Sequence, residues 1–195
     1  MNKPVVVGIT GGIGGGKSTL ATMLRNLGYS VYDTDREARR LQNEHSQLVS
    51  AISSLFGNAI YQNGALNRPV VAERVFSNPS LLQQLTELVH PVVKADFLQW
   101  ISQQEAKIVF IESAVLLEGK FDSLTDSIIV VTASEDIRIQ RVMQRDGISP
   151  EHVKARMQHQ LPEEEKIKRA DKVIYTDNGL KEEEVKRVIG ECMVR

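Results

Sequence analysis

The sequence predicts a three-layer α/β/α fold in which a five-stranded parallel sheet lies between helices. Apolar, β-branched runs alternate with segments of helical periodicity, and a glycine-rich turn directly follows the first of these runs. With 195 residues, of which 42% are hydrophobic and 25% charged, the chain is long enough for one domain with a sizeable core. We therefore expect a single domain that carries inserted segments.

The N-terminal part predicts a strand, a tight turn, a helix and a second strand. Residues 5–10 are a continuous β-branched apolar run, typical of a strand buried on both faces of a parallel sheet. Glycines interrupt this run, and the helical spacing of apolar residues begins over residues 17–27. Gly28 supplies the residue that commonly ends a helix. The second strand, residues 29–32, is short and ends at Asp33.

The stretch from residue 36 to about 104 has helical periodicity with several breaks at glycine and proline. We expect most of it, residues 36–90, to form a helical insertion. The residue before a proline is biased away from helix, so His90-Pro91 predicts a helix boundary. A second helix, residues 91–104, would then return the chain to the sheet.

The C-terminal half predicts three more strands and four helices. Apolar runs place the strands at residues 108–111, 127–132 and 172–176. Capping residues place helix starts at Ser134, Ser149 and Pro162, and a closing helix covers residues 180–192. We expect the acidic runs at residues 163–165 and 182–184 to be solvated helix faces.

Composition narrows the class of partner and the compartment. A formal net charge of -1 gives no field that would recruit nucleic acid or an anionic membrane, so we expect neither as a partner. No apolar stretch approaches the length of a membrane span. A lone cysteine, Cys192, fits a reducing compartment, and we expect a cytoplasmic protein. The four histidines show no metal-ligand spacing.

Residues 11–18 read Gly-Gly-Ile-Gly-Gly-Gly-Lys-Ser and match the P-loop pattern G-x-x-x-x-G-K-[ST]. Such a loop wraps its amide groups around phosphate oxygens, and the following helix points its positive end at the same phosphates. Lys17 would reach the β- and γ-phosphates as a catalytic residue, and the Ser18 hydroxyl would bind Mg²⁺. The motif therefore predicts a P-loop NTPase fold. The ATP-binding residues expected here are Gly12, Ile13, Gly14, Gly15, Gly16, Lys17, Ser18 and Thr19.

Two carboxylates follow the second strand, in Asp33-Thr34-Asp35. Ligands of open α/β sheets bind beyond the carboxyl ends of the strands, so Asp33 would face the γ-phosphate. A carboxylate there can orient an acceptor hydroxyl and accept its proton. Either residue could instead cap the helix that begins near Arg36. We assign the catalytic base to Asp33 and the cap to Asp35.

Arg138, Arg141 and Arg145 have the spacing of one helix face, where like charges repel. An anionic ligand would remove this repulsion. Residues 138–172 hold nine Lys or Arg against six Asp or Glu. We expect a mobile lid, residues 138–169, whose arginines close over the triphosphate, with Arg141 catalytic and both Arg141 and Arg145 binding ATP. The alternative is a solvated basic face.

In their order along the chain, these motifs resemble dephospho-CoA kinases. Residues 8–18 resemble the opening of that family, residues 33–35 its Asp-x-Asp, and residues 141–146 its lid arginine motif. Further matches occur in family order at Phe56-Gly57, residues 64–68, Val75-Phe76, His90-Pro91-Val92, Leu116-Leu117-Glu118, Gln160, Ala170-Asp171 and Val173-Ile174.

The chain departs from the family pattern at a few positions. Gly15 stands where serine is usual, Ala114 where proline is usual, and Glu112 where some members have aspartate. We expect the amide cradle to survive at Gly15, and neither Ala114 nor Glu112 to touch the chemistry. The segment that the family places near adenine matches residues 175–178 only loosely.

The resemblance implies the acceptor, the ribose 3′-hydroxyl of dephospho-CoA, with coenzyme A and ADP as products. It also implies that Asp33 is the base and that Thr10 and Arg36 line the acceptor region. His90 would lie near that substrate or brace its subdomain. The expected divisions are a core of residues 1–35, 91–137 and 170–195, a CoA-binding insertion of 36–90 and a lid of 138–169. A monomer or a small homo-oligomer is expected.

Two other functions remain open from the residues alone. One is a kinase of another small metabolite or of a nucleoside monophosphate on the same fold. The other is a regulatory nucleotide switch, but the guanine-reading Asn-Lys-x-Asp motif is absent and the arginine-rich helix has no purpose there.

Overall fold

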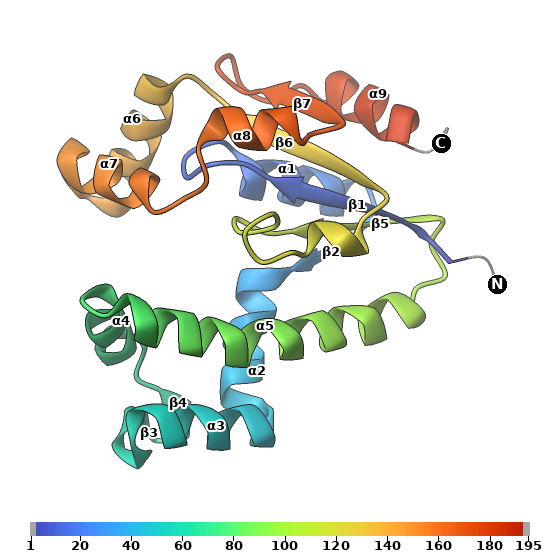
Figure 1. Cartoon of the computed structure of the whole chain (residues 1–195). Helices are drawn as coiled ribbons and strands as arrows, with labels where there is room; N and C mark the ends of the chain where they lie inside the picture. Colours follow the sequence, from blue (N-terminus) through green and yellow to red (C-terminus); the bar gives the residue numbers. More distant parts are fainter. Residues whose placement is uncertain (1–2, 193–195) are drawn as a thin grey trace. The chain divides into compact units, whose positions relative to one another are not determined.

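In a computed structural model that describes residues 3–192, the chain forms two compact units (Figure 1). The first unit ends at Asp33 and resumes at Gln104, and the second is Thr34–Gln103. The second unit is mostly helical and extends beyond residue 90, where we expected the insertion to end.

The first unit contains the predicted five-stranded parallel sheet. Its strands are β1 (Val5–Thr10), β2 (Ser30–Asp33), β5 (Ile108–Glu112), β6 (Ser127–Thr132) and β7 (Lys172–Tyr175). They lie in the order β2-β5-β1-β6-β7, and all four neighbouring pairs are parallel. The fold class is confirmed. Because β1 is central, the glycine-rich turn after it leaves from the middle of the carboxyl edge.

The register of the sheet brings two carboxylates to neighbouring strand ends. Asp33 of β2 is paired with Glu112 of β5, and Ile9 of β1 is paired with the same Glu112. β5 continues beyond the apolar residues 108–111 and ends with Glu112. The ends of β1, β2 and β5 thus form one edge of the sheet.

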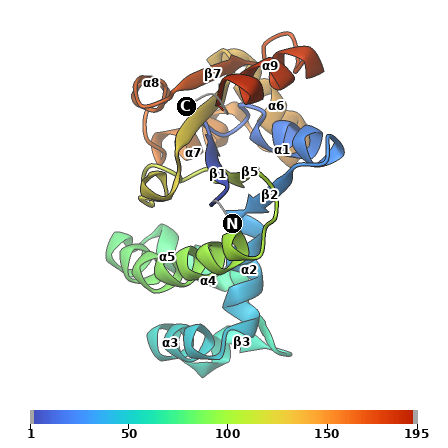
Figure 2. The same cartoon turned by 90° about the vertical axis from the view of Figure 1, so that its right-hand side faces the viewer.

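Helices flank both faces of this sheet. They are α1 (Lys17–Asn26), α6 (Glu135–Asp146), α7 (Pro150–Gln158), α8 (Glu163–Lys168) and α9 (Glu182–Cys192), with a short 3₁₀ turn, η2 (Asp122–Leu124). Leu20 and Leu24 of α1 and Val185 of α9 are buried in one cluster with Val7 and Ile9 of β1. Figure 2 shows α8 on the other side of β1 from α1 and α9. The predicted starts at Ser134, Ser149 and Pro162 are confirmed as cap positions.

Gly28 ends the helical conformation after α1 as predicted. Its φ is 86°, in the left-handed region, and its N–H donates to the Arg25 carbonyl at 3.0 Å. The Tyr29 N–H donates to the Leu24 carbonyl at 3.0 Å, which completes a Schellman pair. The turn directs the chain straight into β2.

The second unit is built from four helices and a small hairpin. Its elements are α2 (Thr34–Glu44), α3 (Ser46–Phe56), η1 (Asn58–Ile60), β3 (Tyr61–Gln62), β4 (Ala65–Leu66), α4 (Arg68–Phe76) and α5 (Pro79–Ser102). Asn63 and Gly64 both have positive φ between β3 and β4, as the usual two-residue hairpin turn requires. The sequence predicts only helices with breaks in this stretch, so the two short strands are an addition. Buried Leu41, Ile52 and Phe97 belong to the core of this unit.

Two predicted helix boundaries in the second unit are wrong. α5 runs through Pro91 without ending, because its buried residues at Val89, Val93 and Phe97 keep the helix packed despite the missing hydrogen bond. α2 begins at Thr34, so Asp35 lies inside its first turn and is not its cap. A carboxylate there still interacts favourably with the helix dipole. Neither α5, at 24 residues, nor any other helix within residues 3–192 is long and apolar enough to cross a membrane.

Candidate active site

The P-loop, residues 11–16, joins β1 to α1 and packs closely against α6. Gly14 has a φ of 80°, and a Cβ built there would lie 2.5 Å from the Arg138 carbonyl oxygen. Gly16, with a φ of 102°, immediately precedes the first helical residue, Lys17. A side chain at Gly14 would therefore require both a strained backbone and a shift of α6.

Lys17 lies over its own loop. Its Nζ donates to the carbonyl oxygens of Gly11 at 2.8 Å and Gly12 at 3.1 Å. The P-loop and its lysine are thus arranged as one hydrogen-bonded unit at the start of α1. An ammonium group and the positive end of a helix together favour an anion at this place.

Glu112 contacts the residue that the motif predicted as a metal ligand. The Ser18 hydroxyl donates to Glu112 Oε1 at 3.1 Å, and Glu112 is buried. Glu112 was expected to stay away from the chemistry, and the structure brings it into contact with the predicted metal ligand. No local motif marks it, because its position depends on β5 lying beside β1. The signal available in sequence was an acidic residue at the end of a buried apolar run.

The electrostatics at this edge distinguish the two carboxylates. Burial raises the pKa of Glu112, and the negative charge of Asp33 raises it further. The Ser18 hydroxyl and the Lys17 ammonium act in the opposite direction on that pKa, without cancelling the rise. A raised pKa favours the protonated carboxyl of Glu112 in the ligand-free protein.

Thr10 is the last residue of β1 and is fully buried. Within residues 3–192 its hydroxyl oxygen has no hydrogen-bond partner. A buried polar group without a partner costs free energy, and such groups in a native fold call for an explanation. The predicted role of Thr10 in the acceptor region remains a prediction.

Two of the three arginines of α6 are paired with carboxylates of the protein itself. Arg138, whose side chain is only 8% exposed, forms an ion pair with Glu163 at 2.9 Å. Arg145, 62% exposed, pairs with Asp146 at 2.7 Å. The charges of Arg138 and Arg145 therefore have protein partners, and a solvated basic face is wrong for Arg138.

Arg141 connects the P-loop to the end of the sheet. Its Nη1 donates to the Thr176 hydroxyl at 2.7 Å and to the Gly14 carbonyl at 3.3 Å, and its Nη2 donates to the Thr176 carbonyl at 2.6 Å. The Thr176 hydroxyl in turn lies 3.0 Å from the Gly15 carbonyl oxygen. Of the two arginines predicted to bind ATP, Arg141 therefore contacts the loop, whereas Arg145 pairs with Asp146.

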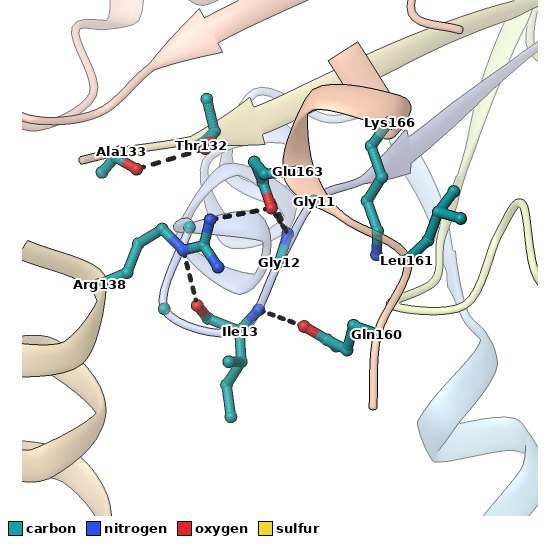
Figure 3. A network of polar contacts seen from close by, with 12 residues as sticks. Gly11, Gly12, Ile13, Thr132, Ala133, Arg138, Gln160, Leu161, Glu163 and Lys166 are labelled. Atoms are coloured by element: carbon teal, nitrogen blue, oxygen red, sulfur yellow. Dashed lines mark hydrogen bonds and ion pairs between the residues drawn. The ribbon is translucent and has the colours of Figure 1, made fainter. Parts of the chain in front are cut away.

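Two side chains from the segment before and within α8 bind amide groups of the P-loop, as Figure 3 shows. Glu163 accepts from the Gly12 N–H at 3.0 Å, and Gln160 accepts from the Ile13 N–H at 2.9 Å. The Ile13 carbonyl accepts from Arg138 Nε at 3.2 Å. The prediction that the acidic run at 163–165 is merely a solvated face is wrong for Glu163.

The two remaining candidates belong to the helical unit. Arg36 of α2 has a side chain that is 79% exposed and lies 3.7 Å from Glu37. His90 is half-buried on α5. Burial lowers the pKa of His90, and the positive charge of Lys94 lowers it further, which favours the neutral imidazole.

The site offers oxygen ligands for a hard divalent cation, but too few for the protein alone to complete its coordination. Within residues 3–192, no group of three or more His, Cys, Asp or Glu side chains is arranged to hold a metal. Ser18 and Glu112 offer a hydroxyl and a carboxylate next to the P-loop. Mg²⁺ commonly has one or two protein ligands and takes the rest from phosphates and water, so this donor set fits it.

Comparisons with known proteins agree on one family. The family description "Dephospho-CoA kinase" matches residues 5–182. A dephospho-CoA kinase from Porphyromonas gingivalis is 45% identical over 161 residues, which cover 82% of this chain and 79% of that protein. One from Thermus thermophilus is 40% identical over 191 residues, 96% and 92% of the two chains. The solved structure of "Dephospho-CoA kinase from Campylobacter jejuni" has a TM-score of 0.70 and 29% identity, and covers 95% of this chain and 96% of its own.

Proposed function

Because the chain belongs to the dephospho-CoA kinase family, we propose that it transfers the γ-phosphoryl group of ATP to the ribose 3′-hydroxyl of dephospho-CoA. The products are coenzyme A and ADP. The family match over residues 5–182 is the observation that carries this proposal, because it includes the P-loop and both carboxylates at the strand ends. The same family match disfavours both alternatives, a kinase of another metabolite or nucleoside monophosphate and a regulatory nucleotide switch.

ATP binds with its phosphates on the main-chain amides of the P-loop from Gly14 onward and on the start of α1, because the Gly12 and Ile13 amides already donate to Glu163 and Gln160. The Lys17 ammonium group gives up its hydrogen bonds to the Gly11 and Gly12 carbonyls and binds the β- and γ-phosphates instead. It can do so because it already lies at the loop. Arg141 stabilises the charge that spreads over the transferred phosphoryl group. The contact of Arg141 with the Gly14 carbonyl supports this role, because it places the guanidinium group at the loop.

Asp33 is the catalytic base. It orients the acceptor hydroxyl, accepts its proton and so raises the nucleophilicity of the oxygen that attacks the γ-phosphorus in line. The position of Asp33 at the carboxyl end of β2, paired with Glu112 across the sheet, supports this assignment. The P-loop and the carboxylate edge hold the two reactants in position, which is most of what phosphoryl transfer requires of a protein.

Mg²⁺ is the expected cofactor, and Ser18 and Glu112 are the residues that would hold it. Ser18 would bind the ion directly, and Glu112 would orient Ser18 and the water molecules around the ion. Bound in this place, Mg²⁺ would neutralise charge on the β- and γ-phosphates.

Of the residues proposed to bind the acceptor, Thr10 belongs to the first unit, and Arg36 and His90 belong to the helical unit. The exposed guanidinium of Arg36 suits an anionic group of dephospho-CoA, and the neutral imidazole of His90 can donate or accept a hydrogen bond. The protein acts in the cytoplasm on two small-molecule substrates, as a monomer or small homo-oligomer. The single cysteine supports a reducing compartment.

Release of ADP with a panel of acceptors tests the proposal. The purified protein is incubated with ATP and Mg²⁺ and with dephospho-CoA, adenosine, AMP or pantetheine phosphate. We expect rapid ADP release with dephospho-CoA and only background release with the other three. Equal release with AMP would indicate a nucleoside monophosphate kinase, and no release with any acceptor would overturn the proposed reaction.

A further inference from the structure

A buried lysine anchors the segment that contacts the first part of the P-loop. Lys166 of α8 is 0% exposed, and Figure 3 shows it on the same short helix as Glu163. Its Nζ donates to the Ala114 carbonyl at 3.2 Å and lies 3.2 Å from Glu118 Oε1. The same Glu118 oxygen accepts from the Leu161 N–H at 3.0 Å. The segment from Leu161 to Lys166 is therefore bound at both ends to residues 114–118, which follow β5.

The position of α8 depends on these contacts more than on the helix itself. α8 has six residues, too few for a helix that is stable alone. A buried ammonium group costs several kcal/mol unless it is paired and hydrogen-bonded. Lys166 satisfies this requirement only where Ala114 and Glu118 are within reach. The pairing therefore determines where α8 lies.

Side chains of α8, of the residue segment before it and of α6 bind three main-chain groups of two P-loop residues. The N–H of Gly12, the N–H of Ile13 and the carbonyl of Ile13 are bound by Glu163, Gln160 and Arg138, respectively. Glu163 also forms the ion pair with Arg138, so the three partners are connected to one another. Displacement of α8 and of the residues just before it would leave the N–H groups of Gly12 and Ile13 without Glu163 and Gln160.

We propose that Lys166 is a positioning residue for the nucleotide: by fixing α8 it holds Gln160 and Glu163 against Gly12 and Ile13, and so keeps the P-loop in its binding conformation. This inference rests on the proposed function, because it concerns the same P-loop. Lys166 acts only through α8.

The same contacts connect the P-loop to the carboxylate edge of the sheet. Ala114 and Glu118 belong to the turn that begins directly after Glu112, the residue that accepts from Ser18. Lys166 thus connects residues 114–118, after β5, to α8, whose residue Glu163 binds the P-loop after β1. The two sides of the site are held in one arrangement by one ammonium group.

The first test removes the loop contact and keeps α8 in place. Calorimetric titration with ADP and Mg²⁺ is compared for Glu163→Ala, Glu163→Gln and the wild type, with Glu164→Ala as a matched control at the exposed neighbouring position. We expect Glu163→Ala to weaken ADP binding by about tenfold, equivalent to one lost hydrogen bond. Glu163→Gln keeps an acceptor for the Gly12 N–H and should lose less. Glu164→Ala should bind as the wild type does.

The second test removes the anchor. Lys166→Met should weaken ADP binding at least as much as Glu163→Ala, whereas Lys168→Met, at an exposed position of the same helix, should not. In the double variant of Lys166 and Glu163 the losses should not add, because the first change already displaces the second residue. If Lys166→Met does not fold, Glu118→Gln replaces it, since it removes only the ionic partner and should still weaken binding several-fold.

Steady-state kinetics provide the readout that a purely structural role would not give. KM for ATP should rise about tenfold in folded Lys166→Met, and kcat at saturating ATP should fall by less than about threefold. ADP affinity equal to the wild type in folded Lys166→Met or Glu118→Gln, or additive losses in the double variant, would overturn the inference. ADP binding requires no acceptor, so failure of dephospho-CoA turnover in the wild type would refute the proposed function separately.

Discussion

Asp33 and Glu112 are neighbouring carboxylates with different surroundings. Glu112 is buried, accepts a hydrogen bond from Ser18 and has a raised pKa. Asp33 is only half-buried and ends β2 at the boundary of the helical unit. Because the Ser18 hydroxyl donates to Glu112, we propose a division of tasks in which Asp33 accepts the proton of the substrate and Glu112 orders Ser18 and the cation.

Replacement of Asp33 with asparagine tests this division. The amide keeps the shape of the side chain but cannot accept the proton, so kcat should fall by about 10²- to 10⁴-fold. ADP affinity should stay within about twofold, because the phosphates bind elsewhere. Stopped-flow assays and calorimetry measure the two quantities. Asp35→Asn, in the first turn of α2, is the control, and a near wild-type kcat in Asp33→Asn would remove Asp33 from the base role.

Glu112 gives a prediction about pH. Its pKa is raised in the folded protein, so the native state binds this proton more tightly than the unfolded chain does. The stability that the protonated carboxyl contributes is fully present below the unfolded value of about 4.5 and is lost as pH rises through the raised folded pKa. The variant Glu112→Gln has no ionisable proton at this position, so it lacks this pH-dependent contribution to stability.

Urea unfolding of the ligand-free protein across this pH range measures the effect. Glu112→Gln should lose less stability than the wild type as pH rises from about 4.5 to 7, and its Mg²⁺-dependent turnover should fall. If the free energy of unfolding depends on pH in the same way in both proteins, the surroundings of Glu112 do not raise its pKa.

The P-loop is an element whose shape depends on its neighbours. Its glycines, its flanking strand and its flanking helix are local in sequence, and this is why they could be predicted. Its contacts with Arg141, Gln160 and Glu163 come from more than 120 residues away and follow no local pattern. The β3–β4 hairpin was missed because strands of two residues carry too little apolar alternation to be detected.

Two glycine variants separate backbone strain from close packing. Gly14 and Gly147 both have positive φ, but only at Gly14 would a new Cβ meet other atoms, those of Arg138. Gly147→Ala should cost about 1–2 kcal/mol of stability and leave ADP affinity unchanged. Gly14→Ala should weaken ADP binding by at least about tenfold as well. Thermal unfolding and calorimetry distinguish these outcomes, and equal ADP affinity in both variants would show that the close approach of α6 is unimportant for binding.

For the whole molecule, the sequence predicts the alternation of strands and helices but not the neighbours that the sheet creates. Glu112 joins the site only because β5 lies between β1 and β2, an order that no local pattern contains. Pro91 predicts a helix end, yet the packing of α5 overrides it. In the sequence, Lys166 is one of several charged residues in 163–169 and nothing marks it as buried, although the fold buries it completely.

The central claim is that the P-loop and Asp33 direct one ribose hydroxyl of dephospho-CoA onto the γ-phosphorus of ATP. The most direct test is ³¹P NMR of the product formed with ATP and Mg²⁺, which identifies the phosphorylated position. We predict a new phosphomonoester on the ribose 3′-oxygen, formed by the wild type and almost absent with Asp33→Asn. A phosphate at any other position, or equal formation by the variant, would contradict the account.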